Sequence, residues 1–365
     1  MGLIRTLLAI AVLIGHAGGV SWLFLPGGMM AVQAFYIISG FYMALILSEK
    51  YIKRKNTYQL FISNRFLRIF PVYWIVLFFF LIVSAISYYI TNHPLILEPY
   101  VKNTLANSQL FILLLLNLVV LGQDLVMFLG LNVDNNFFFL TSDFHYTSPP
   151  VHKFLLIQPS WTIALEFTFY LIAPYLVKLK SKILITLIFT TFAFRFVFYW
   201  IGFYNDPWFY RFFPFELGFF LTGVLAYRIY KWYNLKSISS QIALAVNVIV
   251  LFVIAMIDTF PGPYMVKCYI FYLLIFFAIP FIFMRNRTSK VDNWIGEFSY
   301  PLYICHYPLL MLINSLDTLW ISKDFLPILL LLLSVLFSFL IIKLFIRPLE
   351  SFRQKRVRVT SGNND

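Results

Sequence analysis

Long apolar runs alternate with short polar segments along most of the chain. An α-helix needs about 20 apolar residues to cross a bilayer, and runs of about that length recur here. They are too long, and too poor in period-two alternation, for the strands of a membrane β-barrel. Ten spans are predicted, at 6–24, 29–48, 69–90, 161–177, 183–203, 212–230, 240–257, 265–284, 299–316 and 325–346. The pattern therefore predicts an all-α, polytopic membrane protein.

A further apolar segment at 108–131 is difficult to place. Lysines and arginines gather in alternate connections, which predicts a cytoplasmic side for those connections and for both termini. These cationic connections lie at 50–68, 178–182, 228–236 and 285–290. An eleventh span at 108–131 would move the later cations to the opposite side. We therefore expect a re-entrant or protein-buried helix there, followed by an outer loop at 132–160 that covers the helices.

Composition supports a membrane protein and argues against several other classes. The chain is 61% hydrophobic and 12% charged, whereas soluble domains are roughly a quarter charged. The chain has a net charge of +13, and its lysines and arginines gather between the predicted spans. The orientation of the protein in the membrane explains this charge, so nucleic acid is not an expected partner. Neither the histidines nor the two cysteines have metal-ligand spacing, and no permanently bound cofactor is expected. We predict one membrane domain at 1–348 and a short basic, disordered cytoplasmic tail at 349–365.

The first predicted span contains an arginine and a histidine, Arg5 and His16. Their separation of eleven residues corresponds on a helix to a rise of about 16 Å and a rotation of about 20°, so both lie on one face. Ionisable side chains within a membrane usually have a function. A phosphate held at Arg5 could belong to a molecule whose other end reaches His16. The alternative is a snorkelling arginine together with a structural histidine bonded to a nearby carbonyl.

Two more arginines, Arg65 and Arg68, share a helix face just before the third predicted span. Guanidinium groups bind phosphate with two parallel hydrogen bonds and keep their charge at neutral pH. These arginines are thus candidates for phosphate binding. The alternative is a cationic anchor of the kind that commonly flanks a span.

The fourth predicted span contains a carboxylate, Glu166, with Thr162 and Tyr170 on the same face. A carboxylate facing lipid would be costly, so Glu166 should face a polar interior. Three roles fit: orienting a catalytic imidazole, acting as a base, or binding a sugar hydroxyl. The alternative is a buried ion pair with Arg195 or Arg211.

A second polar stripe occurs in the ninth predicted span, where Ser299, Tyr303 and His306 follow one another at helical spacing. The fold could bring His306 close to His16. Near the outer side, Arg195, Arg211 and Glu216 either line an acceptor cleft or neutralise one another, and we favour neutralisation. Ser39 and Gly40, in the second span, are typical of close helix packing.

Together these motifs resemble the acyltransferase-3 family of integral-membrane O-acyltransferases. The resemblance extends from about Arg5 to Pro348. Five elements occur in the family's order: Arg5 with His16; Ser39, Gly40 and Phe41; Arg65, Arg68 and Pro71; Trp161 through Glu166 with Tyr170 and Pro174; and Ser299, Tyr300, Tyr303, His306 and Pro308. The chain departs from the family pattern at Ile163, where leucine is usual, and at Arg347, where many members have an acidic residue.

The resemblance implies transfer of an acyl group, most often acetyl, from cytoplasmic acyl-CoA to a sugar hydroxyl. The acceptor would be a surface polysaccharide, a lipopolysaccharide or a glycolipid precursor, and the protein would lie among the lipids of the bacterial inner membrane. In this family the basic residues at the cytoplasmic side would bind the CoA phosphates: Arg5, Arg65 and Arg68. Other side chains would line the substrate site: Trp161, Tyr170, Ser299 and Tyr303.

The same resemblance assigns catalysis to His16, with Glu166 and His306 assisting. His16 would act as a general base or as a covalent acyl carrier, and His306 would orient it or stabilise the oxyanion. Some members carry a fused extracytoplasmic domain that completes the transfer. No such domain is recognised in this sequence, so a separate extracytoplasmic transferase is a possible partner.

Two other classes of protein remain compatible with the residues alone. A transporter or flippase would use arginine, histidine and glutamate along a substrate path. A membrane scaffold in a glycan-assembly complex would use them structurally. Dependence on acyl-CoA separates the enzyme from the transporter, and the effect of removing the His16 imidazole separates it from the scaffold.

Overall fold

The computed structural model describes residues 1–51, 57–133, 135–232, 239–316 and 322–362, with side chains up to 356. The predicted cytoplasmic cations Lys53, Arg54, Lys55 and Lys236 lie outside these residues. The longer helices are α1 (Gly2–His16), α2 (Gly28–Ile46), α3 (Thr57–Thr91), α5 (Asn107–Val119), α6 (Trp161–Leu176), α7 (Ser181–Trp200), α9 (Phe213–Trp232), α10 (Ser240–Met256), α11 (Tyr264–Asn286), α12 (Lys290–Asn314), α13 (Phe325–Ile341) and α14 (Arg347–Gly362).

Shorter elements connect these helices. Two are short α-helices, α4 (Glu98–Lys102) and α8 (Trp208–Arg211), and two are antiparallel strands, β1 (Leu129–Asn132) and β2 (Phe137–Leu140). The remaining turns are η1 (Leu47–Tyr51), η2 (Leu95–Leu97), η3 (Leu125–Phe128), η4 (Phe144–Tyr146), η5 (Val151–Phe154), η6 (Gln158–Ser160), η8 (Ile257–Thr259) and η9 (Ile342–Ile346). The sequence pattern did not predict the hairpin.

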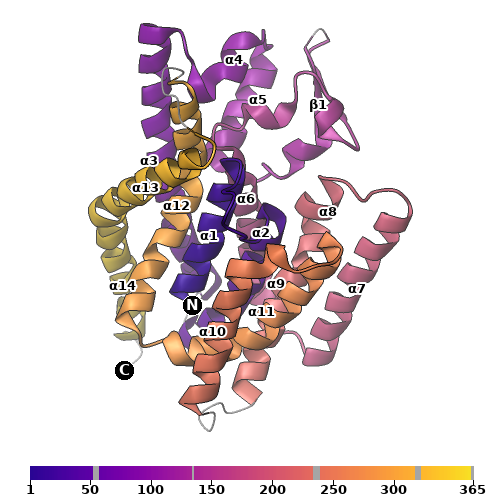
Figure 1. Cartoon of the computed structure of the whole chain (residues 1–365), viewed down its shortest axis with the longest axis vertical. Coiled ribbons are helices and arrows are strands. Elements are labelled where there is room, and N and C mark those ends of the chain that lie inside the picture. Colours follow the sequence, from indigo (N-terminus) through magenta and orange to yellow (C-terminus); the bar gives the residue numbers. More distant parts are fainter. Residues whose placement is uncertain (52–56, 134, 233–238, 317–321, 363–365) are drawn as a thin grey trace.

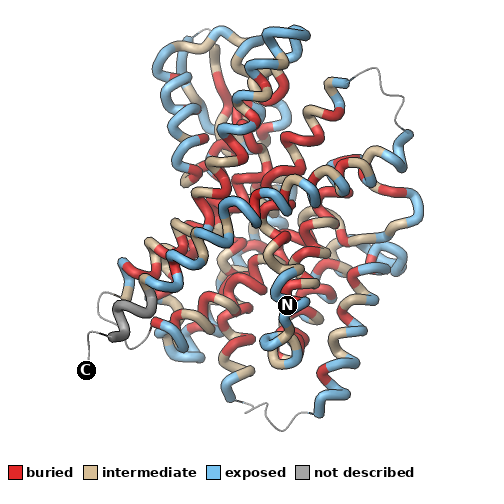
Figure 2. Tube along the Cα trace, turned by 90° about the vertical axis from the view of Figure 1, so that its left-hand side faces the viewer, coloured by how far each residue is buried: buried red, intermediate tan, exposed pale blue. Residues whose placement is uncertain are grey.

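The protein is a helical polytopic membrane protein. Within the described residues, seven helices are long and apolar enough to cross a bilayer. Large apolar side chains face outwards on them, such as Phe189 at 71% and Trp200 at 73% exposure on α7 and Leu336 at 59% on α13. So much exposed apolar surface is unfavourable in water and suits contact with lipid. Figure 2 shows the buried residues along the interior faces of the helices.

Each of the ten predicted spans contains a helix. The seven that meet the length and hydropathy criteria do not include α1, α6 or α12. Of these, α1 has 15 residues and α6 has 16, fewer than the roughly 20 that cross the hydrocarbon core. The number of spans and the side of each terminus therefore stay predictions.

Helix α1 lies at the centre of the bundle and packs mainly against α2 and α12, while α4, α5 and the hairpin lie at one end, beside the last turns of α3 (Figure 1). Helices α2 and α9 approach closely through two glycines. A Cβ atom on Gly40 would lie 1.9 Å from the carbonyl oxygen of Phe220, and one on Gly223 would lie 1.9 Å from that of Ile37. The packing role predicted for Gly40 is thus confirmed.

Helix α1 ends at His16, eight residues before the predicted end of the first span. Gly18 and Gly19 follow with φ angles of +94° and +82°, a conformation that ends helices and that glycine adopts without strain. The amide of Gly19 donates to the carbonyl of Ile14 at 2.9 Å, which closes the last turn. His16 consequently stands at the carboxyl end of a helix instead of the middle of one.

The segment 108–131 does not form a full-length helix. Helix α5 has 13 residues and is followed by η3 and β1, so it is too short to span. It is only partly buried: Leu113 and Asn117 face inwards, whereas Phe111 is 67% exposed. A short helix is therefore present in this segment, burial covers one face of it, and its re-entrant placement stays a prediction. Tyr73 and Trp74 of α3 donate hydrogen bonds to carbonyls at its end.

The described part of the tail is helical, so the prediction of disorder for 349–365 is wrong there. Helix α14 continues from α13 through the π-helical turn η9. Its Arg353 pairs with Glu350 one turn earlier, and the Nε atom of Arg353 donates to the carbonyl of Asn64 on α3 at 3.1 Å. These polar contacts stabilise a segment whose low apolar content had suggested disorder.

Candidate active site

Helices α1 and α12 run parallel and in register, and this arrangement sets the geometry of the site. At their amino ends, the carboxylate of Asp292 accepts hydrogen bonds from the amides of Gly2 at 2.7 Å and Leu3 at 3.0 Å. A Cβ atom on Gly296 would lie 2.8 Å from the Cα atom of Gly2, so the backbones touch. One turn later, Thr6 donates to a carbonyl of α12 at 2.8 Å.

This register brings the two predicted catalytic histidines together. The Nδ1 atom of His16 lies 2.8 Å from the Nε2 atom of His306, and the planes of the two rings differ by 13°. The Nδ1 atom of His306 lies 3.3 Å from the carbonyl oxygen of Leu302. The approach of His306 to His16, which the sequence could not establish, is thus present in the structure.

The tautomers of the histidine pair follow from these partners. A carbonyl only accepts hydrogen bonds, so the Nδ1 atom of His306 carries a proton when the ring is neutral. Its Nε2 atom then accepts from the Nδ1–H group of His16, and the Nε2 atom of His16 retains a lone pair. His306 is fully buried, whereas His16 is exposed. The nitrogen with a free lone pair therefore belongs to the accessible member of the pair.

A tyrosine and a threonine continue the polar path from the histidines. The ring centroid of Tyr303 lies 5.9 Å from that of His306, and its hydroxyl is 2.9 Å from Oγ1 of Thr162 on α6. Ser299, predicted to share this stripe, donates instead to the carbonyl of Gly296 in its own helix at 3.0 Å. The structure thus places Tyr303 beside the histidines and turns the hydroxyl of Ser299 to the backbone.

Glu166 lies one helical turn further along α6 from Thr162. Its carboxylate accepts a hydrogen bond of 2.7 Å from Ser39 and a short one from Tyr170. Among the described residues, no hydrogen bond joins it to either histidine. Ser39, which the sequence suggested as a packing residue, therefore also has a polar role, and its hydroxyl adjoins the glycine at the α2–α9 contact.

The two arginines considered as partners of Glu166 form ion pairs elsewhere. Arg195 pairs with Glu216 at 3.0 Å, and both side chains are buried. Arg211 forms a bidentate pair with Asp206 at 2.7 and 2.9 Å. Neutralisation at the outer side was thus correctly predicted for Arg195 and Glu216, but the partner of Arg211 was not foreseen.

The arginines predicted to bind phosphate form one cationic cluster. Arg5 lies 5.9 Å from the ring centroid of Tyr42 and interacts electrostatically with Arg68 and Glu166. Arg65 interacts with Arg68 as well. Arg65 is 4% exposed, and its Nε atom has no hydrogen-bond partner among the described residues, whereas Arg68 is exposed. The cluster thus combines an accessible arginine with a buried one whose hydrogen-bonding capacity is not fully used.

Most of the predicted site residues therefore fall into two groups, and Glu166 interacts electrostatically with Arg5 of one and with Tyr303 of the other. From Glu166 to Thr162 and from Tyr303 to His306 the helical rise is about 6 Å and about 4.5 Å. Polar side chains thus continue from the arginines, through Glu166 and Tyr170, to the histidine pair. Trp161 lies outside this line: it is buried, and the guanidinium of Arg211 stacks 4.2 Å from its ring centroid.

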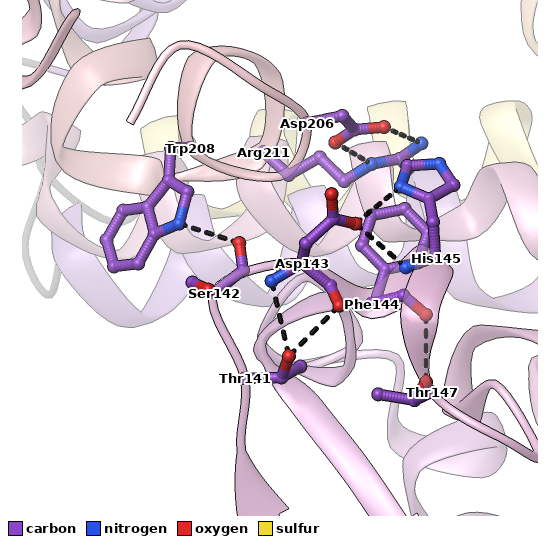
Figure 3. Close-up of polar contacts among 9 residues, drawn as sticks. All are labelled: Thr141, Ser142, Asp143, Phe144, His145, Thr147, Asp206, Trp208 and Arg211. Carbon is purple, nitrogen blue, oxygen red and sulfur yellow. Dashed lines mark hydrogen bonds and ion pairs between the residues drawn. The ribbon is translucent and has the colours of Figure 1, made fainter. Parts of the chain in front are cut away.

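Residues 141–147 pack over the end of α8 near this guanidinium (Figure 3). Trp208 donates to the carbonyl of Ser142 at 3.0 Å, and the ring of Phe144 lies 5.5 Å from the guanidinium of Arg211. His152 lies against Phe144 on the next turn. Burial, together with the charge of Arg211, lowers the pKa of His152 to about 4.

Comparison with protein families identifies this membrane bundle. The family model Acyl_transf_3, described as an acyltransferase domain, matches residues 1–347. Because the match covers nearly the whole chain, the protein belongs to the acyltransferase-3 family and is a membrane acyltransferase. No curated protein and no solved structure matched the chain significantly.

Proposed function

We propose that the protein transfers a short acyl group, most often acetyl, from cytoplasmic acyl-CoA to a sugar hydroxyl. The acceptor would belong to a surface polysaccharide or a glycolipid precursor at the bacterial inner membrane. The observation that carries this proposal is the continuity of polar side chains from the arginine cluster to the histidine pair. Such a path suits a donor with phosphates at one end and a thioester at the other.

The arginine cluster supplies the donor end of the site. Arg68 is accessible, and the Nε–H group of Arg65 has no hydrogen-bond partner among the described residues. Buried cations without full hydrogen bonding are costly, and a phosphate would relieve that cost through charge-assisted bonds. Arg5, on α1, interacts electrostatically with Arg68 and so belongs to the same cationic cluster. Phosphates held there would direct the pantetheine arm past Glu166 and Tyr170, whose polar atoms can bind its amides.

The histidine pair supplies the chemistry. The Nε2 atom of His16 removes the proton of the acceptor hydroxyl as its oxygen attacks the thioester carbonyl. The carbon–sulfur bond then breaks, the thiolate of CoA leaves, and the proton on His16 passes to it. His306 positions the ring, because its bond to the carbonyl of Leu302 fixes which nitrogen of His16 is unprotonated. With both of its nitrogens engaged, His306 is better suited to this role than to binding the oxyanion.

Acyl transfer by the purified protein tests the proposal. Protein in nanodiscs is given radiolabelled acetyl-CoA and a membrane extract containing the native glycolipids, and His16→Ala serves as the inactive comparison. We expect label in the glycan fraction with the unaltered protein only. Binding of acetyl-CoA should weaken in Arg65→Ala/Arg68→Ala, whereas a transporter would bind no CoA. Full transfer by His16→Ala would overturn the catalytic assignment.

Mass spectrometry of surface glycans identifies the acceptor. Glycans from cells with and without the gene should differ by one acyl mass on a sugar. Restoration by the wild-type gene but not by the His16→Ala gene would link that difference to the histidine pair. Identical glycans in both strains would argue against a sugar acceptor.

A further inference from the structure

We propose that α14 forms part of the donor site, with Arg353 as a phosphate-binding residue and Glu350 as the carboxylate that the donor's phosphate displaces. This inference rests on the proposed use of a CoA donor. It goes beyond the motif residues, because α14 begins where the family match ends at residue 347.

Helix α14 packs against the first turns of α3, directly beside the cationic cluster. The Nε atom of Arg353 donates to the carbonyl of Asn64 at 3.1 Å. Arg356 donates to the hydroxyl of Ser63 at 3.0 Å and to the side-chain oxygen of Asn64 at 3.4 Å. Asn64 is the immediate neighbour of Arg65 in the sequence. These contacts hold α14 at the part of α3 that carries two of the predicted phosphate-binding arginines.

Positively charged side chains outnumber negatively charged ones where α14 meets α3. Arg353 is 8% exposed, and its charge interacts with those of Arg65 and Arg68. Glu350 pairs directly with Arg353 and also interacts electrostatically with Arg68 and Arg65. One carboxylate therefore serves three guanidinium groups. Like charges this close, two of them on buried side chains, are stabilised by an additional anion.

The chemistry of the arginines indicates what that anion is. Guanidinium groups on two helices form a fork-shaped set of N–H donors that matches phosphate oxygens. The unpaired Nε–H group of Arg65 adds a donor that no described residue uses. A phosphorylated nucleotide carries several negative charges and would compete with Glu350 for Arg353. Glu350 thus occupies the site in the absence of donor and leaves it when the phosphates bind.

Single-residue variants with a matched control test this inference. Arg353→Ala should weaken acetyl-CoA binding about ten- to a hundredfold, the equivalent of one charge-assisted hydrogen-bonded contact. Glu350→Gln should tighten binding, because it removes the competing charge. Lys355→Ala is the control, since it removes one cation from an exposed position of the same helix. Titration calorimetry in nanodiscs measures each dissociation constant, and thermal unfolding verifies that each variant is folded.

A second ligand separates phosphate binding from a general effect on the site. S-acetyl-pantetheine has the thioester but lacks the nucleotide and its phosphates, so its affinity should be the same in Arg353→Ala and in the unaltered protein. The inference is wrong if Arg353→Ala and Lys355→Ala bind acetyl-CoA equally, or if Glu350→Gln binds it more weakly. An unaltered protein that binds no acetyl-CoA would instead refute the proposed function. The Glu350→Gln result still decides the inference if Arg353→Ala does not fold.

Discussion

The Nδ1 atom of His16 lies 2.8 Å from the Nε2 atom of His306, although 290 residues separate them in the sequence. The contact is possible because α1 and α12 run parallel with their backbones touching at Gly2 and Gly296. In this pair the buried ring holds the accessible ring in one tautomer.

Replacing the buried histidine should reduce the rate without impairing binding. We expect His306→Gln to lower kcat at least tenfold and to leave the KM for acyl-CoA nearly unchanged, because the tautomer of His16 is no longer fixed. His16→Ala should lose about 10² to 10⁴ in kcat, the usual contribution of a general base. Steady-state kinetics of acyl transfer provide the measurement.

A double variant examines whether the two histidines act as a unit. His16→Ala/His306→Gln should be no slower than His16→Ala alone, since His306 acts through the ring that is already absent. A His306→Gln enzyme with an unchanged kcat, or losses that simply multiply in the double variant, would contradict the positioning role.

The close contact of α2 and α9 should not tolerate a side chain. We expect Gly40→Ala and Gly223→Ala each to destabilise the protein by about 1–3 kcal/mol, because the new methyl group would overlap a backbone carbonyl. Gly28→Ala is the matched control, since a Cβ atom there has no neighbour within 4 Å. Thermal unfolding in detergent compares the stability of the variants. Equal stability of all three would show that α2 and α9 can move apart without a free-energy cost.

The buried pair of Arg195 and Glu216 should be sensitive to the loss of one partner. Arg195→Met leaves a carboxylate that is 0% exposed without its counter-ion, and we expect a loss of about 3–5 kcal/mol. Arg195→Met/Glu216→Leu should recover part of this loss, because no buried charge remains. The free energies of unfolding of the single and double variants, measured under the same conditions, test this expectation. A double variant less stable than the single one would mean that the pair itself is strongly favourable.

The stability of the segments around His152 should decrease in mild acid partly because of this residue. Its pKa of about 4 in the folded protein lies below the ordinary value of 6.5, so the unfolded chain binds more protons between these values. Stability from this residue is therefore present above pH 6.5 and is lost as the pH falls towards 4. The His152→Phe variant should show a smaller decrease in unfolding temperature between pH 7 and pH 5 than the unaltered protein. Equal decreases would exclude this contribution.

The sequence predicts the helices well because their apolar runs are long. It also predicts that Glu166 and Tyr170 share a helix face, since that depends only on local geometry. The end of α1 was misplaced, although Gly18 and Gly19 carry a recognisable stop signal within the apolar run. The partner of Arg211 was missed because Asp206 lies in a connection, and no periodicity relates the two residues.

Contacts between distant segments are the part of the site that the sequence could not specify. The contact of Asn64 with Arg353 depends on where α14 packs against α3, which no local pattern records. The low apolar content of the tail suggested disorder because its stabilising contacts are polar and come from another helix. The meeting of the two histidines was conceivable from the sequence, but it required the register of α1 against α12.

The separation of α1 and α12 along the chain also has a consequence for biosynthesis. Helix α1 is synthesised first, whereas its partner α12 is synthesised only after most of the other helices. The contact between α1 and α12 therefore forms late in biosynthesis. A nascent chain therefore carries Arg5, Arg65 and Glu166 long before His16 acquires its hydrogen-bond partner. On the proposed mechanism, an unfinished chain lacks the His306 ring that fixes the tautomer of His16, so we expect acyl transfer to reach its full rate only after nearly complete synthesis.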